Sequence, residues 1–300
     1  MPAPIGARAL SDGEPGYPPG LRDLGDAPRA VFVRGGRLPA CEHAIAIVGS
    51  RAASRYGLER ARRLAGDLAR LGYTVVSGLA RGIDAAAHRG ALDSGGRTVA
   101  VIPSGLDAIT PRHHLELASE IAARGVLLTE WESGDPRGRG VFVRRNRLIA
   151  ALAAATVVVE AAERSGALTT AAFARRLGRP VLAVPGDVDR ETARGCHALI
   201  KGGARLCESA GDVLEAIGAS RPAGVSQGAR PAACASEPSA GEGTPESRLL
   251  AVLTRDPLTV DALAHAAGLS VPQTLTALLA LQWAGAVLML PGQRWARASS

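Results

Sequence analysis

The residues best suited to chemistry form a cluster of guanidinium groups near the middle of the chain. The cluster consists of Arg139, Arg144, Arg145, Asn146 and Arg147. A guanidinium group presents several N–H donors in a planar fork, and this geometry matches the oxygens of phosphates. These positions therefore predict an anion-binding site built for phosphate groups.

A second group of candidate ligands follows the apolar run 156–159, which predicts a fully buried strand. After this strand come Glu160 and then a turn with glycine and hydroxyl groups, namely Ser165, Gly166, Thr169 and Thr170. Ligands of open parallel sheets bind outside the carboxyl ends of the strands. We expect this turn to donate hydrogen bonds to the same anion, because N-capping would account for one of the hydroxyls but hardly for all three.

Two further turns contain glycine. Gly49, Ser50 and Arg51 follow the run 45–48, and Gly78 to Gly82 follow the run 73–77. The first turn lacks the GxGxxG fingerprint, and no acidic residue closes the second strand, so no nicotinamide cofactor is expected. A hydroxyl, backbone amides and an arginine at the start of a helix suit a phosphate, although an ordinary strand-to-helix turn explains them equally well.

Two acidic residues could support catalysis. Asp84 and His88 are four residues apart on one helix and could form an acid–base pair, but structural roles are the favoured interpretation. Glu160 stands where a catalytic carboxylate could lie, without a second carboxylate or a Ser/His/Asp set at motif spacing. The sequence therefore favours a binding protein over an enzyme.

Composition narrows the class of partner. The 300 residues carry a net charge of +7, 47% are hydrophobic and only 3% are aromatic. An excess of arginine favours anionic partners. The four cysteines (Cys41, Cys196, Cys207, Cys234) form no CxxC pair, and a zinc site from Cys196, His197 and Cys207 lacks the usual spacing. No signal peptide or membrane-spanning run is present in the sequence, so a reduced, cytoplasmic setting is expected.

Alternating strand and helix patterns predict a doubly wound α/β domain with a mostly parallel sheet over residues 41–218. The expected strands are 45–48, 73–77, 98–102, 126–129, 156–159 and 180–184, and the expected helices are 58–71, 83–91, 112–123, 144–154, 168–177, 196–201 and 210–217. Residues 1–40 resemble an irregular lead-in that ends in a short edge strand at 30–33.

The C-terminal part has a different pattern. Residues 219–244 are rich in Ala, Gly, Pro and Ser and predict a flexible linker. Three short helices (246–254, 260–267, 271–282) and a hairpin at 286–295 then predict a winged-helix domain over 245–300. Its recognition helix contains no Lys or Arg, which favours a protein-interaction or packing element over a DNA reader.

Taken together, seven motifs resemble one family, the DNA-processing protein A (DprA/Smf) recombination mediators. They are AIVGSR (46–51), SGLARGIDAAAH (77–88), FVRRNRLIAALA (142–153), VVVEA (157–161), SGALTTAAFA (165–174), RPVLAVPGD (179–187) and GCHALIKGGA (195–204). The resemblance implies an extended Rossmann fold, a homodimer, sequence-independent binding of single-stranded DNA and loading of RecA in natural transformation. It implies no enzymatic activity and no cofactor.

The resemblance also assigns positions. Arg51 matches the arginine of the GSR motif, Arg145 to Arg147 match the RNR element, and Arg139 matches an upstream basic residue. Lys201 lies in the segment LI-basic-G, and Ser165 to Thr170 occupy the SG-TA turn. Val143, Ala153 and His197 depart from the usual Pro, Ser and Asn, and the chain is expected to begin after the helical, sterile-alpha-motif-like domain that many members carry.

An alternative hypothesis is that the protein is an enzyme. Nucleotide phosphoribohydrolases of the lysine-decarboxylase-like family place a glycine-threonine phosphate turn beside an arginine and a glutamate, which Ser165 to Thr170 and Glu160 loosely match. The double-glycine signature of that family is missing. A second rival is a transcription factor using the winged helix, which the uncharged recognition helix disfavours.

Overall fold

The computed structural model describes residues 6–136, 138–219, 244–253, 257–283, 286–290 and 294–297. The chain divides into two units, Met1–Gln227 and Gly228–Ser300. The predicted linker, apart from its two end residues, lies outside the described residues.

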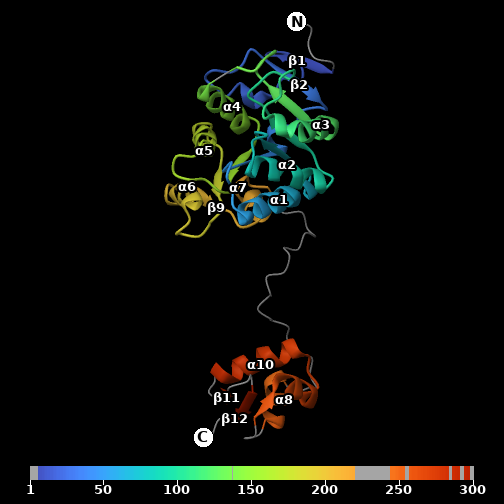
Figure 1. Ribbon diagram of the computed structural model, residues 1–300, viewed down its shortest axis with the longest axis vertical. Helices are drawn as coiled ribbons and strands as arrows, with labels where there is room; N and C mark the ends of the chain where they lie inside the picture. Colours follow the sequence, from blue (N-terminus) through green and yellow to red (C-terminus); the bar gives the residue numbers. More distant parts are fainter. Residues whose placement is uncertain are drawn as a thin grey trace. The chain divides into compact units, whose positions relative to one another are not determined.

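A nine-stranded mixed sheet forms the centre of the first unit (Figure 1). Its strands are β1 (Ala7–Ser11), β2 (Ala30–Gly35), β3 (Ala44–Val48), β4 (Thr74–Ser77), β5 (Thr98–Val101), β6 (Val126–Thr129), β7 (Ala155–Val158), β8 (Val181–Ala183) and β9 (Arg205–Leu206). They lie in the order β1-β2-β6-β5-β4-β3-β7-β8-β9, and the strands from β6 to β9 are parallel. This confirms the predicted mostly parallel α/β fold. The order reverses between β3 and β7, which makes their carboxyl ends the switch point of the sheet.

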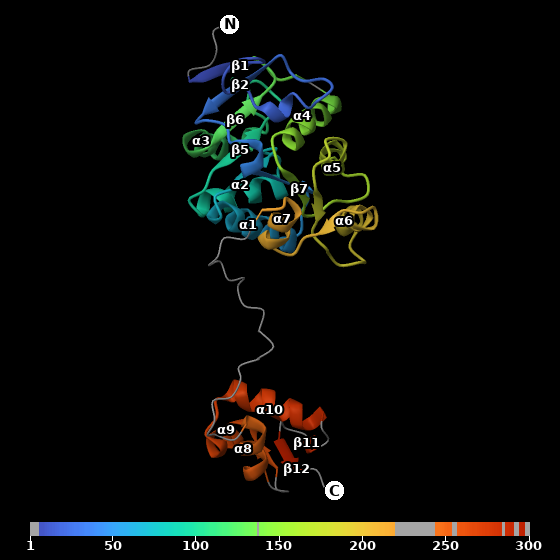
Figure 2. The ribbon, with the colours of Figure 1, turned by 180° about the vertical axis from the view of Figure 1, so that it is seen from behind.

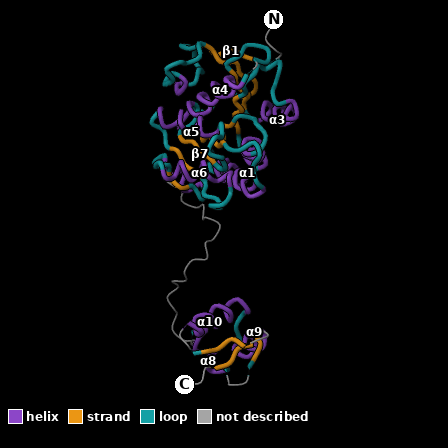
Figure 3. Tube along the Cα trace, turned by 60° about the vertical axis from the view of Figure 1, so that its left-hand side comes forward, coloured by secondary structure: helices purple, strands orange, loops and turns teal. Residues whose placement is uncertain are grey.

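Helices cover both faces of this sheet (Figures 2 and 3). Alternate strand residues, such as Ile45 and Ile47, pack against α1 (Arg55–Arg70), α2 (Ile83–Asp93) and α7 (Ala210–Ala216), and α3 (Leu115–Arg124) covers the same face beside them. The intervening residues, such as Ala46 and Val48, face α4 (Arg139–Ala151), α5 (Ala167–Arg176) and α6 (Glu191–Lys201). Strands buried on both faces read as continuous apolar runs, which explains why the periodicity identified them.

The N-terminal part differs from the prediction. The expected edge strand at 30–33 is part of β2, which lies between β1 and β6, and the edge is formed by β1. The lead-in also joins the core, because Tyr17, Leu21 and Leu24 are buried against the same cluster as α4. The Tyr17 hydroxyl donates a hydrogen bond to the Pro28 carbonyl at 2.5 Å. The irregular stretch between β1 and β2 agrees with the prediction, but the edge position of the strand at 30–33 does not, and β1 was not predicted.

Several element boundaries also differ. Helix α4 begins at Arg139 and not at residue 144, α6 begins at Glu191 and not at 196, and the two-residue strand β9 was not predicted. Val141, Phe142 and Val143 favour strands by propensity, which hid the first turn of α4.

The second unit contains α8 (Pro245–Val252), α9 (Val260–Ala267) and α10 (Val271–Trp283) with a three-stranded sheet. Its strands are β10 (Leu258–Thr259), β11 (Val287–Leu290) and β12 (Arg294–Arg297), and β11 and β12 pair as an antiparallel hairpin. The predicted helices and hairpin are confirmed. Among the helices described in either unit, none has the length and apolar character that a membrane span requires.

Candidate nucleic-acid interface

The loop after β3 lies at the switch point and carries Arg51. The Ser50 amide donates to the Glu160 carbonyl at 2.6 Å, which joins this loop to the end of the neighbouring β7 segment. The Ser50 hydroxyl accepts from the Ala52 amide at 3.1 Å. Arg51 itself is exposed, and its guanidinium carbon lies 4.7 Å from the centre of the Phe142 ring. Within the described part of the chain, no carboxylate lies within 4.0 Å of it.

The loop after β4 packs against the backbone of Ser50 and Arg51. Gly82 has a φ of +84°, and a Cβ at this position would overlap the Ser50 carbonyl and the Arg51 backbone. The Ile83 amide donates to the Ser50 carbonyl at 3.2 Å. Only glycine allows both the positive φ and this close approach, so the two loops are fixed against each other.

Leu79 holds an unusual conformation in the same loop, with a φ of +57°. Its carbonyl lies 2.8 Å from Nδ1 of His114, and its side chain is buried. A left-handed leucine persists only where the surroundings enforce it. The loop is therefore held at Leu79 as well as at Gly82.

Arg145 points into the protein and not toward solvent, because only 4% of the residue is exposed. Its Nη1 donates to the Gly78 carbonyl at 2.5 Å and to the Val101 carbonyl, so one guanidinium joins the ends of β4 and β5. Burial lowers the pKa of Arg145 to about 10, and nearby Asp84 opposes this shift. A Cβ on Gly78 would lie 2.7 Å from the guanidinium, which explains the glycine there.

The neighbours of Arg145 on α4 also make internal contacts. Asn146 Nδ2 donates to Thr169 Oγ1 at 2.8 Å and to the Gly166 carbonyl at 3.1 Å, which connects α4 to the start of α5. Arg147 is 1% exposed and pairs with Glu130 and Asp26, each at 2.8 Å.

The expected cluster of phosphate-facing guanidinium groups is thus divided. Arg144 is more than half exposed, lies 3.2 Å from the Glu130 carboxylate and stacks 5.8 Å from the Trp131 ring centre. Arg145 and Arg147 face inward. Arg139 opens α4, but its side chain lies outside the described residues.

The turn at the start of α5 uses its hydroxyls locally. Ser165 Oγ accepts from the Ala167 amide at 3.3 Å, and Thr169 Oγ1 donates to the Gly166 carbonyl at 2.6 Å. Thr170 is 1% exposed. We expected these hydroxyls to donate to an anion, with N-capping accounting for only one of them, and the structure instead engages two of the three, those of Ser165 and Thr169, in local hydrogen bonds.

Lys201 does not join the site. It is the last residue of α6, which begins after the carboxyl end of β8 and runs back toward the start of β9. Arg175, in the last turn of α5, donates to the Leu199 and Gly202 carbonyls on either side of it. Lys201 therefore lies toward the amino edge of the sheet, opposite the edge that carries Arg51.

The candidate acids have structural roles. Glu160 is 4% exposed and accepts from the Ser54 amide at 2.8 Å and the Ser54 hydroxyl at 2.5 Å, and Ser54 in turn caps α1. His88 is fully buried with Nδ1 2.7 Å from Thr98 Oγ1, and burial lowers its pKa to about 3. Asp84 is buried and accepts from the Ala80 amide at 3.3 Å. The described residues contain no His, Cys, Asp and Glu cluster that could hold a metal ion.

Two exposed arginines were missed by the sequence analysis. Arg81 lies in the loop after β4, and Arg112 begins the short 3-10 helix η3 (Arg112–His114) after β5. The sequence signal for them is the scarcity of acidic residues in these two loops.

Comparison with known proteins agrees with this architecture. The family model described as DNA recombination-mediator protein A matches residues 8–218, and the model of the DprA winged helix domain matches residues 231–293. Protein Smf of Escherichia coli is 39% identical over 279 residues, which cover 92% of this chain and 74% of that protein. The DNA processing protein DprA assigned to Mycobacterium tuberculosis is 49% identical over 199 residues, and the match covers about half of its length.

Two solved structures are similar to the first unit. DNA processing protein A from Streptococcus pneumoniae aligns with a TM-score of 0.65 and 38% identity over 69% of this chain and 73% of that chain. The protein from Helicobacter pylori, solved to explain its single-stranded DNA binding mode, aligns with a TM-score of 0.62 and 27% identity over 70% of this chain and 94% of that chain. The family model and the Escherichia coli relative settle the assignment: this chain belongs to the DNA recombination-mediator protein A family.

Proposed function

We propose that this chain binds single-stranded DNA without sequence preference, through phosphates held at the carboxyl edge of its sheet. The observation that carries the proposal is Arg51, an exposed guanidinium at the switch point that no described carboxylate neutralises. The single-stranded DNA binding of the Helicobacter pylori relative supports it.

Phosphate contacts dominate binding in this proposal. Only 3% of the residues are aromatic, so few rings are available for stacking with bases. Phe142 lies beneath the Arg51 guanidinium and fixes its direction by a cation–π contact. Affinity should therefore fall steeply with salt, because bound cations release counterions from the strand.

The predicted site residues divide into two roles. Arg51 and Arg139 contact phosphates directly, whereas Arg144 is already paired with Glu130. The backbone groups of Ser50 and the Gly166 carbonyl serve internal hydrogen bonds that hold the loops beside Arg51. Arg145 and Asn146 position the loops, since their donors already bind Gly78, Val101 and Thr169. Arg147 anchors α4 through Glu130 and Asp26.

Family membership supports a proposal for the cellular role. We propose that the chain acts in the cytoplasm as a homodimer and loads a RecA recombinase onto incoming strands during natural transformation. It acts without enzymatic turnover, and the engagement of Glu160 with Ser54 supports this part, because a catalytic carboxylate must be free to reach a substrate.

The second unit contributes protein contacts in this proposal and does not read bases. The exposed positions of α10 include Val271, Leu275 and Leu279, and the helix contains no Lys or Arg. A phosphate-binding helix would carry cations. Sequence-specific duplex binding that is abolished by Leu275→Asp would contradict this assignment.

Fluorescence anisotropy tests the proposal. Labelled oligo-dT and a matched duplex are titrated with wild type, Arg51→Ala and the control Arg62→Ala, an exposed arginine that already pairs with Asp93. We expect tighter binding of the single strand, a loss of roughly tenfold for Arg51→Ala and no change for Arg62→Ala. Equal affinity for both forms of DNA would contradict the proposal.

A further inference from the structure

We propose that Glu160 is a specificity-determining residue, whose carboxylate occupies the anion-binding position at the start of α1 and so excludes free phosphate and nucleotides from the switch point. The inference goes beyond the proposed function, because it concerns small ligands with a terminal phosphate and does not depend on the binding of single strands. The anion that fills the position is a side chain of the protein itself.

Glu160 lies where nucleotide-binding sheets hold their phosphates. In open α/β proteins the ligand binds at the switch point, and its phosphates lie at the amino terminus of the helix after the first parallel strand. In this fold that helix is α1, which follows β3, and Glu160 comes two residues after the end of the neighbouring strand β7. A carboxylate is therefore present where a Rossmann-like sheet offers its phosphate site.

Both oxygens of this carboxylate are bound by Ser54, the residue that caps α1. Oε2 accepts from the Ser54 amide at 2.8 Å, and Oε1 accepts from the Ser54 hydroxyl at 2.5 Å. The Ser54 hydroxyl accepts in turn from the Gly57 amide at 3.1 Å. Donors at the start of a helix are the groups that bind phosphate in other proteins, and here an internal carboxylate engages them.

The surroundings of Glu160 suit an anion without providing a paired cation. Glu160 is 4% exposed, and among the Arg, Lys and His side chains that the structure describes, none lies within 4.0 Å of its carboxylate. The first turn of α1 contains no acidic residue, and its Arg55 is exposed and pairs with Glu59 at 2.7 Å. A buried charge without a counter-ion needs hydrogen bonds, and the positive end of a helix dipole stabilises it further. The start of α1 is thus an electropositive site that Glu160 fills.

The first turn of α1 leaves space for this carboxylate at Gly57. A Cβ at Gly57 would lie 2.5 Å from Cδ and 2.6 Å from Oε2 of Glu160. Glycine destabilises a helix relative to alanine, so its presence in this turn has a steric reason. The Glu160 side chain occupies the space that glycine provides, and a second anion has no room beside it.

The test compares the thermal stability of wild type and Glu160→Ala, as full chains, in inorganic phosphate and in sodium chloride of equal ionic strength. Glu160→Ala should melt at a lower temperature in chloride, because the donors of Ser54 lose their acceptor. Phosphate should then raise its melting temperature by about 3–6 °C more than that of wild type, at a concentration roughly ten times the dissociation constant. Wild type is the reference because phosphate stabilises folded proteins in general by exclusion from their surface.

Two controls separate the effect of charge from the effect of space. Glu163→Ala removes an exposed carboxylate three residues further along the chain, and we expect it to respond to phosphate as wild type does. The double variant Gly57→Ala, Glu160→Ala refills part of the space with a methyl group and should lose the response. Gly57→Ala alone should lower the melting temperature, because its Cβ collides with the Glu160 carboxylate.

The inference is overturned if Glu160→Ala responds to phosphate no more than wild type, or if it folds neither in chloride nor in phosphate. An equal response of Glu160→Ala and the double variant would also overturn it, since the phosphate would then bind elsewhere. Folding of Glu160→Ala only in phosphate would be the strongest form of the expected result. All these variants retain Arg51, so failure of the proposed function in the oligo-dT titration leaves the inference intact.

Discussion

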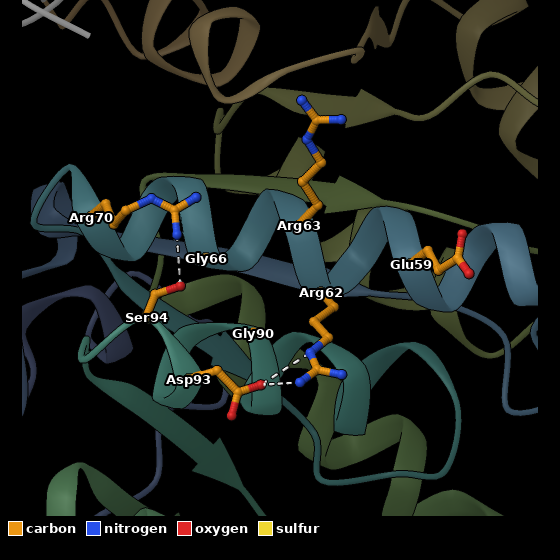
Figure 4. A pocket seen from close by; sticks show the side chains of 8 residues that line it. All are labelled: Glu59, Arg62, Arg63, Gly66, Arg70, Gly90, Asp93 and Ser94. Atoms are coloured by element: carbon orange, nitrogen blue, oxygen red, sulfur yellow. Dashed lines mark hydrogen bonds and ion pairs between the residues drawn. The ribbon is translucent and has the colours of Figure 1, made fainter. Parts of the chain in front are cut away.

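Two regions of the first unit are rich in arginine, and they differ in what surrounds the guanidinium groups. One is a groove of about 380 Å³ between α1 and α2, lined by Glu59, Arg62, Arg63, Gly66, Arg70, Gly90, Asp93 and Ser94 (Figure 4). The other is the carboxyl edge of the sheet around Arg51. The number of arginines does not separate the two, because the groove is lined by Arg62, Arg63 and Arg70 and the edge carries Arg51, Arg81 and Arg112.

Acidic neighbours neutralise the groove. Arg62 donates to Asp93 through two nitrogens at 2.6 and 3.0 Å, and Arg70 pairs with Asp67. Figure 4 shows Arg62 turned toward Asp93 while Arg63 points away from α2. No carboxylate in the described residues pairs with Arg51. The charge left after pairing, and not the number of arginines, distinguishes the proposed phosphate site from the groove.

The two regions also differ in their support. The groove arginines are exposed and can move without disturbing the core, although Gly90 packs closely on the Arg62 carbonyl. The edge rests on the buried guanidinium of Arg145 and on the constrained loop from Gly78 to Gly82. Substitution of the buried support of the edge should therefore reduce stability. Substitution of a groove arginine should change neither stability nor DNA binding by much.

The largest expected effect is on stability. Arg145→Ala removes the donors of the Gly78 and Val101 carbonyls and the cation near buried Asp84, so it should cost about 3–5 kcal/mol in the free energy of unfolding. Arg62→Ala should cost less than about 1 kcal/mol, because exposed ion pairs contribute little. Urea denaturation measures both, and equal losses would contradict the structural role of Arg145.

Lowering the pH should reduce the free energy of unfolding by a similar amount. Burial lowers the pKa of His88 from 6.5 to about 3, so below pH 6.5 the unfolded chain takes up a proton that the folded chain does not. Folding stability should then fall as the pH drops, by about 3 kcal/mol between pH 6.5 and 4. His88→Gln should remove this part of the pH dependence in denaturation curves. An unchanged curve would mean that His88 titrates normally in the fold.

The smallest effect is expected in the groove. Asp93→Asn releases Arg62 from its partner and leaves one additional exposed charge in the groove between α1 and α2. Affinity for oligo-dT should change less than about twofold, since an isolated charge lacks the ordered neighbours of the edge. A gain as large as the loss caused by Arg51→Ala would show that any unpaired arginine suffices.

The sequence predicts much of the fold around the two regions, but it does not predict which arginines are buried or paired. The buried strands and the glycine turns followed from periodicity and residue type. Arg145 could have been assigned to the interior, because it precedes Leu148, Ile149 and Leu152 by three, four and seven residues and so shares their buried helical face. Read as a motif, it was grouped with Arg144, which faces solvent.

Other features had no usable signal. The position of Lys201 depends on β9, a two-residue strand that is too short for a periodic pattern. The pairing of Arg147 with Asp26 spans 121 residues, and local propensity carries no information about such contacts. The difference between the two arginine-rich regions likewise depends on contacts between helices, such as Arg62 with Asp93.

In the proposed function, unpaired arginine at the sheet edge binds phosphate while paired arginine in the groove does not. The most direct test is the slope of log K against log salt for oligo-dT, measured for wild type, Arg51→Ala and Arg62→Ala. We expect Arg51→Ala to make this negative slope shallower by about 0.7 and Arg62→Ala to leave it unchanged. Equal slopes for wild type and Arg51→Ala, or a shallower slope for Arg62→Ala, would contradict this expectation.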